Sequence, residues 1–274
     1  MRSEALNMTF GLGSYALAWA IGAPGYPPDD PLDVFGILRT AAANGFGLVQ
    51  LADNIPLHEL SEHQLFEVAQ LADDININIE VGTRGIADDN LACYLELAKR
   101  FNSPILRVVV DSSGHEPSPA EVVDIIGEML SQFADAEIVL AIENHDRFSA
   151  ATLRDIIEDL ASSWVGVCLD TVNSFGSLEG PAVVLNILAP YVVNLHIKDF
   201  TIAREPHNMG FRISGTPAGQ GMLDIPWLVR QLPTDKRVIT GIVELWPAPE
   251  PVLAETIAKE ARWVAESAAF LQTL

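Results

Sequence analysis

The chain has 274 residues, 49% hydrophobic and 19% charged, which is the composition of a globular protein with ample material for a core. Its 37 acidic and 16 basic residues give a formal net charge of −21, which opposes binding to nucleic acid. No apolar run approaches the roughly 18 residues of a membrane span, and the N-terminus lacks the pattern of a secretory signal, so we expect a cytoplasmic protein without a membrane partner.

Short apolar runs rich in Val, Ile and Leu alternate with amphipathic stretches along the whole chain. Such runs are typical of parallel strands that are covered on both faces. We expect strands at residues 9–14, 48–51, 76–81, 105–110, 138–142, 165–169, 192–196 and 238–243.

Helices are expected between these strands, at residues 32–44, 61–73, 88–101, from 118 onward, 150–160, 181–188, 225–231 and 251–271. Ser61 with Gln64, and Ser118 with the glutamate three residues later, have the spacing of a capping box. Pro119 suits a first helical position, and Gly45 suits a helix C-terminus.

Eight strand–helix units at a spacing of about 30 residues predict a (β/α)8 TIM barrel, with residues 1–274 forming a single domain. An open doubly wound sheet is the alternative. The sequence Gly11-Leu12-Gly13-Ser14-Tyr15-Ala16 lacks the third glycine of the GxGxxG fingerprint that such a sheet often carries. The two cysteines, Cys93 and Cys168, have no CxxC spacing, and we expect both to be buried, reduced thiols.

A long loop is expected from residue 198 to residue 225, after the seventh strand. Long loops in compact domains are often functional, and this loop leaves the end of the barrel at which TIM-barrel active sites lie. Its candidate substrate-binding residues are Lys198, Arg204 and His207. Lys198 and Arg204 are as compatible with a solvated loop position as with substrate binding, and His207 fits a solvated position better than substrate binding.

The last four expected strands each deliver a potential metal ligand to their C-terminal edge: Glu143, Asp170, His196 and Glu244. In a closed barrel these edges form a ring, so the four side chains can converge on one point. Three carboxylates and one imidazole suit a moderately hard divalent cation, with Mn²⁺ as our first choice and Mg²⁺, Co²⁺, Fe²⁺ or Zn²⁺ as alternatives. A single acidic residue after a strand is often only a helix cap, so the prediction depends on the set of four.

These four positions, together with Gly219-Gln220-Gly221-Met222-Leu223-Asp224, resemble the xylose isomerase-like sugar isomerase/epimerase superfamily, in particular its D-tagatose 3-epimerase-like branch. The resemblance implies one metal ion on the four ligands, a sugar or sugar derivative as substrate, and proton transfer by Glu143 and Glu244 through an enediolate. The resemblance is also compatible with a homo-oligomer.

Two departures from that branch matter. Asn173 stands where the epimerases usually carry a substrate-binding histidine, and His145 follows the first ligand by two residues. The run from Glu143 to Phe148 resembles the large subunits of C-glycoside deglycosidases, which implies a lyase acting on 3-oxo-glycosides with a small partner subunit. His145 is a candidate base in either reaction. It is equally compatible with a histidine that caps a helix or that supports a metal ligand from behind.

Three functions therefore compete: a metal-dependent isomerase/epimerase, a metal-dependent lyase and, remotely, a non-catalytic ligand-binding barrel. Trp19 and Trp246 follow expected strand ends and can stack on a sugar, although packing at the rim explains them equally well. Glu80 and Arg107 lie within the third and fourth expected strands. We expect one of them to point into the barrel mouth, or the two to pair with each other.

Overall fold

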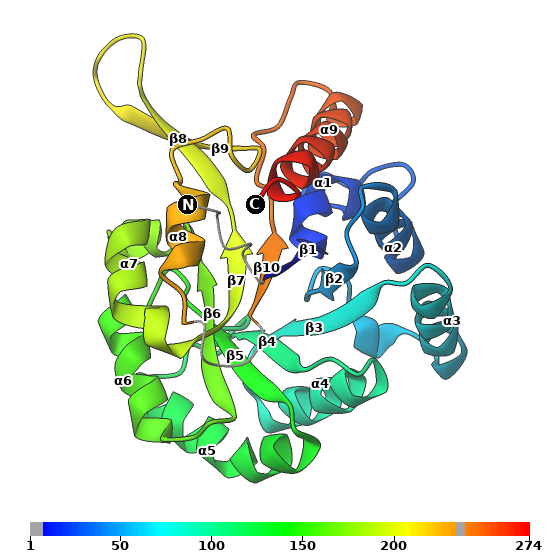
Figure 1. The fold of residues 1–274 in the computed structure, drawn as a ribbon, viewed down its shortest axis with the longest axis vertical. Helices are drawn as coiled ribbons and strands as arrows, with labels where there is room; N and C mark the ends of the chain where they lie inside the picture. Colours follow the sequence, from blue (N-terminus) through cyan, green and yellow to red (C-terminus); the bar gives the residue numbers. More distant parts are fainter. Residues whose placement is uncertain (1–7, 234–238) are drawn as a thin grey trace, which may run out of the picture.

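The computed structural model describes residues 8–233 and 239–274. Eight parallel strands close into a barrel in the order β1-β10-β7-β6-β5-β4-β3-β2, which confirms the predicted TIM barrel (Figure 1). The barrel strands are β1 (Thr9–Gly13), β2 (Leu48–Leu51), β3 (Asn78–Arg84), β4 (Ile105–Val109), β5 (Val139–Glu143), β6 (Val165–Asp170), β7 (Val192–Ile197) and β10 (Thr240–Val243). Residue 238, where the eighth strand was expected to begin, lies outside the described residues.

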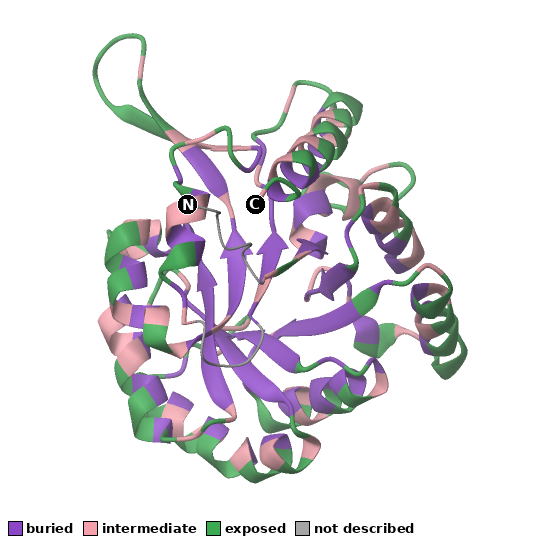
Figure 2. Ribbon diagram, viewed as in Figure 1, coloured by how far each residue is buried: buried purple, intermediate pink, exposed green. Residues whose placement is uncertain are grey.

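Helices form a ring around the barrel, with buried residues on the side facing the strands and exposed residues on the outside (Figure 2). They are α2 (Val34–Ala43), α3 (Glu62–Asp74), α4 (Asp88–Arg100), α5 (Pro119–Ala136), α6 (Ala150–Leu160), α7 (Pro181–Leu188), α8 (Ile225–Arg230) and α9 (Leu253–Leu271), with the short α1 (Ala18–Ile21) after β1. None of the helices in the described ranges is both long and apolar enough to cross a membrane.

The capping patterns in the sequence mark the helix ends correctly. Ser61 and Gln64 form both hydrogen bonds of a capping box at α3, and Ser118 and Glu121 do so at α5. Gly45 follows α2 with φ of 77°, a left-handed conformation that favours glycine.

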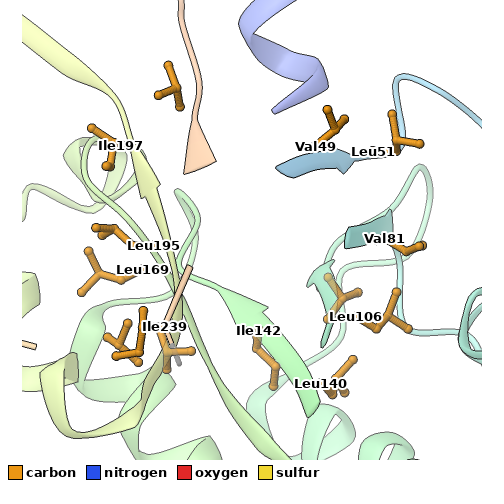
Figure 3. Packing of buried hydrophobic residues seen from close by; sticks show 14 of the residues in the cluster. Val49, Leu51, Val81, Leu106, Leu140, Ile142, Leu169, Leu195, Ile197 and Ile239 are labelled. Atoms are coloured by element: carbon orange, nitrogen blue, oxygen red, sulfur yellow. The ribbon is translucent and has the colours of Figure 1, made fainter. Parts of the chain in front are cut away.

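Side chains alternate across the barrel wall, and the outward set forms the main hydrophobic core. Residues such as Val49, Leu106, Ile142 and Leu195 are fully buried between the strands and the helices (Figure 3). The apolar runs that identified the strands therefore supply the packing between barrel and helices.

Many of the side chains that point into the barrel are polar. The apolar runs in the sequence did not predict this. The inward residues Gln50, Glu80, Arg107, Asn194 and His196 are each at most 2% exposed. They hydrogen-bond across the barrel, and a small separate cluster of Ile105, Val139, Ala141 and Cys168 packs inside the wall as well.

The expected long loop after the seventh strand is wrong for most of its length, because the segment forms an antiparallel hairpin of β8 (Asp199–Arg204) and β9 (Phe211–Thr216). Its β-branched and aromatic residues favour strands. The turn is made by Asn208 and Gly210, which have φ of 61° and 139°. The hairpin extends beyond the barrel, and its tip is exposed (Figures 1 and 2).

The expectation for the cysteines is half wrong. Both thiols are free and Cys168 is buried inside the barrel, but Cys93 is exposed on α4. In an amphipathic helix the residue before a buried Tyr94 falls on the outer face, and the helical period places Cys93 there.

Candidate metal centre

The C-terminal ends of four adjacent strands bring together the four residues that the sequence singled out. Glu143 and Asp170 are the last residues of β5 and β6, His196 lies in β7, and Glu244 directly follows β10. Nδ1 of His196 lies 3.3 Å from Oε2 of Glu143, 3.5 Å from Oε2 of Glu244 and 3.8 Å from Oδ2 of Asp170. All four side chains are buried.

The donor set of this cluster fits a divalent cation. Potential ligand atoms of Asp170, His196 and Glu244 all lie within 4.8 Å of one another, and so do those of Glu143, Cys168 and His196. Nδ1 of His196 and Oε1 of Glu244 are buried and have no hydrogen-bond partner in the described chain. Buried polar atoms without partners are costly, and a cation bound between them would remove that cost.

One oxygen of Asp170 is fixed by the backbone and the other faces the cluster. Oδ1 accepts hydrogen bonds from the N–H groups of Val172 and Asn173, both at 2.8 Å. Asn144 supports the same strand end, because its amide donates to the carbonyl of Asp170 at 2.9 Å and accepts from the N–H of Asp170 at 2.7 Å. The carboxylate is thus held in place by the local backbone.

Two cations, the buried Arg107 and the partly exposed Lys198, pair with the carboxylates. Nζ of Lys198 lies 2.8 Å from Oδ2 of Asp170 and 2.9 Å from Oε2 of Glu244. Nε of Arg107 pairs with Oε2 of Glu143, and Nη1 of Arg107 lies 3.2 Å from Oδ1 of Asp53. Burial alone would raise the pKa of Glu143, but Arg107 and then the other cationic groups hold that pKa below its usual value.

Asn173, a candidate substrate-binding residue in the sequence, contacts this cluster, and its substrate-binding role stays a prediction. Its amide nitrogen donates to Oε1 of Glu143 at 2.7 Å, and its amide oxygen lies 3.4 Å from Nζ of Lys198. Both oxygens of Glu143 are therefore engaged, one by Arg107 and one by Asn173.

A second charged group, which the sequence analysis missed, lies beside the first. Asp53 follows β2 and accepts hydrogen bonds at Oδ2 from the hydroxyl of Tyr15 at 2.9 Å and from Nε of Arg84 at 3.4 Å. The side chain of Arg84, the last residue of β3, is 35% exposed. The signal in the sequence is a polar residue at the C-terminal end of an early barrel strand, the same kind of position that marks the ligands on the later strands.

The expected pairing of Glu80 with Arg107 is wrong. The β3–β4 register places Gly82, not Glu80, beside Arg107, so the glutamate lies two residues deeper in the barrel. Arg107 instead points toward the mouth of the barrel and contacts Glu143 and Asp53, which was the alternative prediction for this pair. Glu80 instead accepts hydrogen bonds from Gln50, Asn194 and Thr240.

The glycine-rich motif closes the base of the hairpin. Oδ2 of the buried Asp199 accepts the N–H groups of Gly219 and Gly221, each at 2.9 Å, and Oδ1 accepts those of Leu223 and Phe200. A Cβ on Gly221 would lie 2.2 Å from Oδ1 of Asp199, so the close approach needs glycine. This carboxylate holds the chain directly after Lys198.

The other sequence candidates lie apart from these contacts. His145 is 29% exposed and faces Asp146 at 3.5 Å. Trp19 donates from Nε1 to the carbonyl of Pro247 at 3.0 Å, and Trp246 packs over Gly215. The remaining two are on the exposed arm of the hairpin, where Arg204 covers the ring of Phe211 and His207 accepts from the N–H of Met209. A substrate-binding role for these residues stays a prediction.

This closed barrel, with its ligand-like cluster on the later strands, belongs to the xylose isomerase-like TIM barrel family, whose sequence profile matches residues 38–274. Within it, the chain is 33% identical over 266 residues to the 3-oxo-isoapionate decarboxylase of Pectobacterium atrosepticum, covering 97% of this chain and 96% of that protein.

Solved structures show the same fold. A D-psicose 3-epimerase determined with D-fructose superposes with a TM-score of 0.70 at 16% identity, covering 96% of this chain and 98% of its own. A xylose isomerase-like protein of Mycobacterium smegmatis determined with magnesium superposes with a TM-score of 0.67 at 17% identity, covering 95% of this chain and 98% of its own. At such identities the likeness concerns the fold.

Proposed function

We propose that this chain is a divalent-metal-dependent enzyme that decarboxylates a 3-oxo sugar acid. The observation that carries the reaction class is the 33% identity to a 3-oxo acid decarboxylase over nearly the full length of both chains. The site supports it with a cluster of carboxylates for a cation and, beside that cluster, an arginine with spare hydrogen-bonding capacity.

Glu143, Asp170, His196 and Glu244 would hold the cation, with Mn²⁺ as our first choice and the ion's identity to be measured. When bound, the cation supplies a Lewis acid that polarises a carbonyl oxygen. The fit depends on the buried, unpartnered Nδ1 of His196 and Oε1 of Glu244 described above.

The reaction breaks the bond between the carboxylate carbon and C2 of the substrate. The electron pair of that bond passes to the C3 carbonyl and forms an enolate, carbon dioxide leaves, and C2 gains a proton. Positive charge near the carbonyl oxygen stabilises the enolate, and Lys198, with its Nζ between Asp170 and Glu244, supplies it from the protein. His145, two residues beyond Glu143 and partly exposed, is our candidate donor of the final proton.

Arg84 is our candidate for the substrate carboxylate. Arg107 and Lys198 each have two carboxylate partners, whereas Arg84 pairs with Asp53 through a 3.4 Å contact of its Nε. The planar guanidinium of arginine matches a carboxylate through two parallel hydrogen bonds. A substrate acid that binds there would lie beside the cluster rather than compete for it.

A metal-dependent isomerase or epimerase is the second candidate. It is favoured by the approach of Glu143, at the end of β5, and Glu244, directly after β10, to one point, Nδ1 of His196. Such a reaction needs a carboxylate base, and the hydrogen bonds from Arg107 and Asn173 stabilise the charged carboxylate of Glu143, which makes it a weaker base. Decarboxylation creates its enolate without removing a C–H proton, so it makes no such demand on Glu143.

The two candidates are separated by the fate of the substrate carboxylate. The metal-loaded protein is incubated in D₂O with a branched 3-oxo sugar acid labelled with ¹³C at the carboxylate, and in parallel with a panel of neutral ketoses. Labelled carbon dioxide above the spontaneous rate is the expected result. Deuterium exchange into a ketose without carbon dioxide release would favour the epimerase and overturn the decarboxylase.

A further inference from the structure

A buried polar network lies beneath the metal ligands, and nothing above assigns it a role. Oε1 of Gln50 lies 2.6 Å from Nε2 of His196, across the barrel and 146 residues away in the chain. The amide nitrogen of Gln50 donates to Oε2 of Glu80 at 3.0 Å and to Oδ1 of Asn194 at 3.1 Å. All four residues are at most 1% exposed.

Hydrogen-bond partners fix which way the amide of Asn194 points. Its nitrogen donates to Oγ1 of Thr240 at 2.8 Å, and the hydroxyl of Thr240 donates in turn to Oε1 of Glu80, also at 2.8 Å. Its oxygen lies 3.1 Å from Sγ of Cys168, a weak donor. Reversing this amide would place its nitrogen against the amide nitrogen of Gln50. The oxygen Oδ1 of Asn194 therefore faces Gln50 and accepts its hydrogen bond.

The orientation of Gln50 follows from its neighbours. Both hydrogens of its amide nitrogen have acceptors, Oε2 of Glu80 and Oδ1 of Asn194. A reversed amide would place Oε1 of Gln50 against these two oxygens, with no hydrogen between them. Its own oxygen therefore points at Nε2 of His196. An amide oxygen can only accept, so Nε2 carries the hydrogen of the neutral imidazole and Nδ1 carries the lone pair.

We propose that Gln50, oriented by Glu80 and Asn194, is a positioning residue that holds His196 as the Nε2–H tautomer with Nδ1 ready to bind the cation. The inference rests on the proposed metal centre. It explains why the ring is aimed so that its unpartnered nitrogen lies 3.3–3.8 Å from three carboxylates. Ligating histidines commonly depend on such a partner at the other ring nitrogen.

The network also works against a competing state of the site. With the hydrogen on Nδ1, His196 would donate to Glu143 or Glu244 and occupy the position that the cation needs. With Gln50 in place, that tautomer would set an Nε2 lone pair against the amide oxygen at 2.6 Å. Gln50 thus favours, for the neutral ring, the metal-binding Nε2–H tautomer over the Nδ1–H tautomer.

The first test measures Mn²⁺ affinity of metal-free protein by calorimetry, with no substrate present. Gln50→Met keeps the length of the side chain and removes the acceptor, and we expect Mn²⁺ binding to weaken by about 10- to 100-fold. Ser103→Ala is the matched control, because Ser103 is also buried and makes two hydrogen bonds, to Val81 and Ile105, away from the ligands. It should leave the affinity unchanged.

The second test reads the tautomer in the unmodified chain. Long-range ¹H–¹⁵N correlation spectra of histidine-labelled protein, loaded with Mg²⁺, should show the His196 signal in the Nε2–H pattern, assigned by its loss in His196→Asn. An Nδ1–H pattern, or Gln50→Met binding Mn²⁺ within threefold of the unmodified chain, would overturn the inference. Failure of the unmodified chain to bind any divalent cation would instead overturn the proposed metal centre.

Discussion

Arg107 offers the sharpest test of how the site is held together before a cation binds. Its guanidinium is 2% exposed and pairs with the fully buried carboxylate of Glu143 and with Asp53. Arg107→Met leaves the buried carboxylate of Glu143 with the neutral amide of Asn173 and with His196, which also faces Asp170 and Glu244. Breaking a buried pair from one side costs about 3–5 kcal/mol of the free energy of unfolding.

For a chain of this size the loss corresponds to a fall in melting temperature of about 6–10 °C, taking roughly 2 °C per kcal/mol. The assay is calorimetric unfolding of the metal-free protein at pH 7. Arg100→Met is the control, because Arg100 makes a surface pair with Glu62, whose side chain is 86% exposed. Loss of a surface pair costs under about 1 kcal/mol, so the control should melt within about 2 °C of the unmodified chain.

Two further measurements separate charge from packing. The pKa of Glu143 is lowered in the folded chain, so its pairing stabilises the fold above its ordinary pKa and the stabilisation is lost as the pH falls. The deficit of Arg107→Met should therefore shrink as the pH falls from 7, because burial without the guanidinium raises the pKa of the Glu143 carboxyl and lets it take up a proton that removes the buried charge. Adding Glu143→Gln should recover part of the loss at pH 7. If Arg107→Met melts no lower than the Arg100→Met control, the reasoning is refuted.

Three other outcomes are expected. Arg84→Gln should raise KM for a 3-oxo sugar acid by about 10- to 100-fold, the loss of a charged hydrogen bond worth about 1.5–3 kcal/mol, and an unchanged KM would remove Arg84 from the substrate site. His196→Ala should contain less bound metal than the unmodified chain in elemental analysis, and equal metal content would contradict this. Chelation of the metal from the unmodified chain should lower its melting temperature by about 5 °C relative to protein with Mn²⁺ at 100 times its Kd, and equal melting temperatures would contradict this. Burial raises the pKa of Glu260 to about 7 despite hydrogen bonds from the N–H groups of Trp19 and Ala20, so its contribution to stability is present below about pH 4.5 and declines as the pH rises through 7. Glu260→Gln should flatten that decline in a series of melting temperatures from pH 5 to pH 8.

The fold and the upper layer of the site were predictable because both depend on local patterns. Apolar runs of four to seven residues mark the strands, and the first polar residue after each run marks the rim. Closure of the barrel then brings Glu143, Asp170, His196 and Glu244 together without any knowledge of their contacts.

The deeper contacts were not predictable in the same way. Gln50 and His196 are partners only because the barrel closes with a particular stagger between strands, and no local pattern encodes that stagger. The same stagger separates Glu80 from Arg107. The hairpin segment contains glycines and charged residues, which favoured the prediction of a loop. It also has the alternation of a short two-stranded ribbon, in which Phe200-Thr201-Ile202 pairs with Ile213-Ser214-Gly215.

The polar filling of the barrel limits how the protein can change. On the outer wall, an aliphatic residue such as Leu195 can be exchanged for one of similar volume at small cost. Inside, replacing Asn194 alone would strand donors or acceptors on Gln50, Glu80 and Thr240 together. Interior positions should therefore vary in concerted sets, and an engineer who wishes to retune the metal must redesign several strands at once.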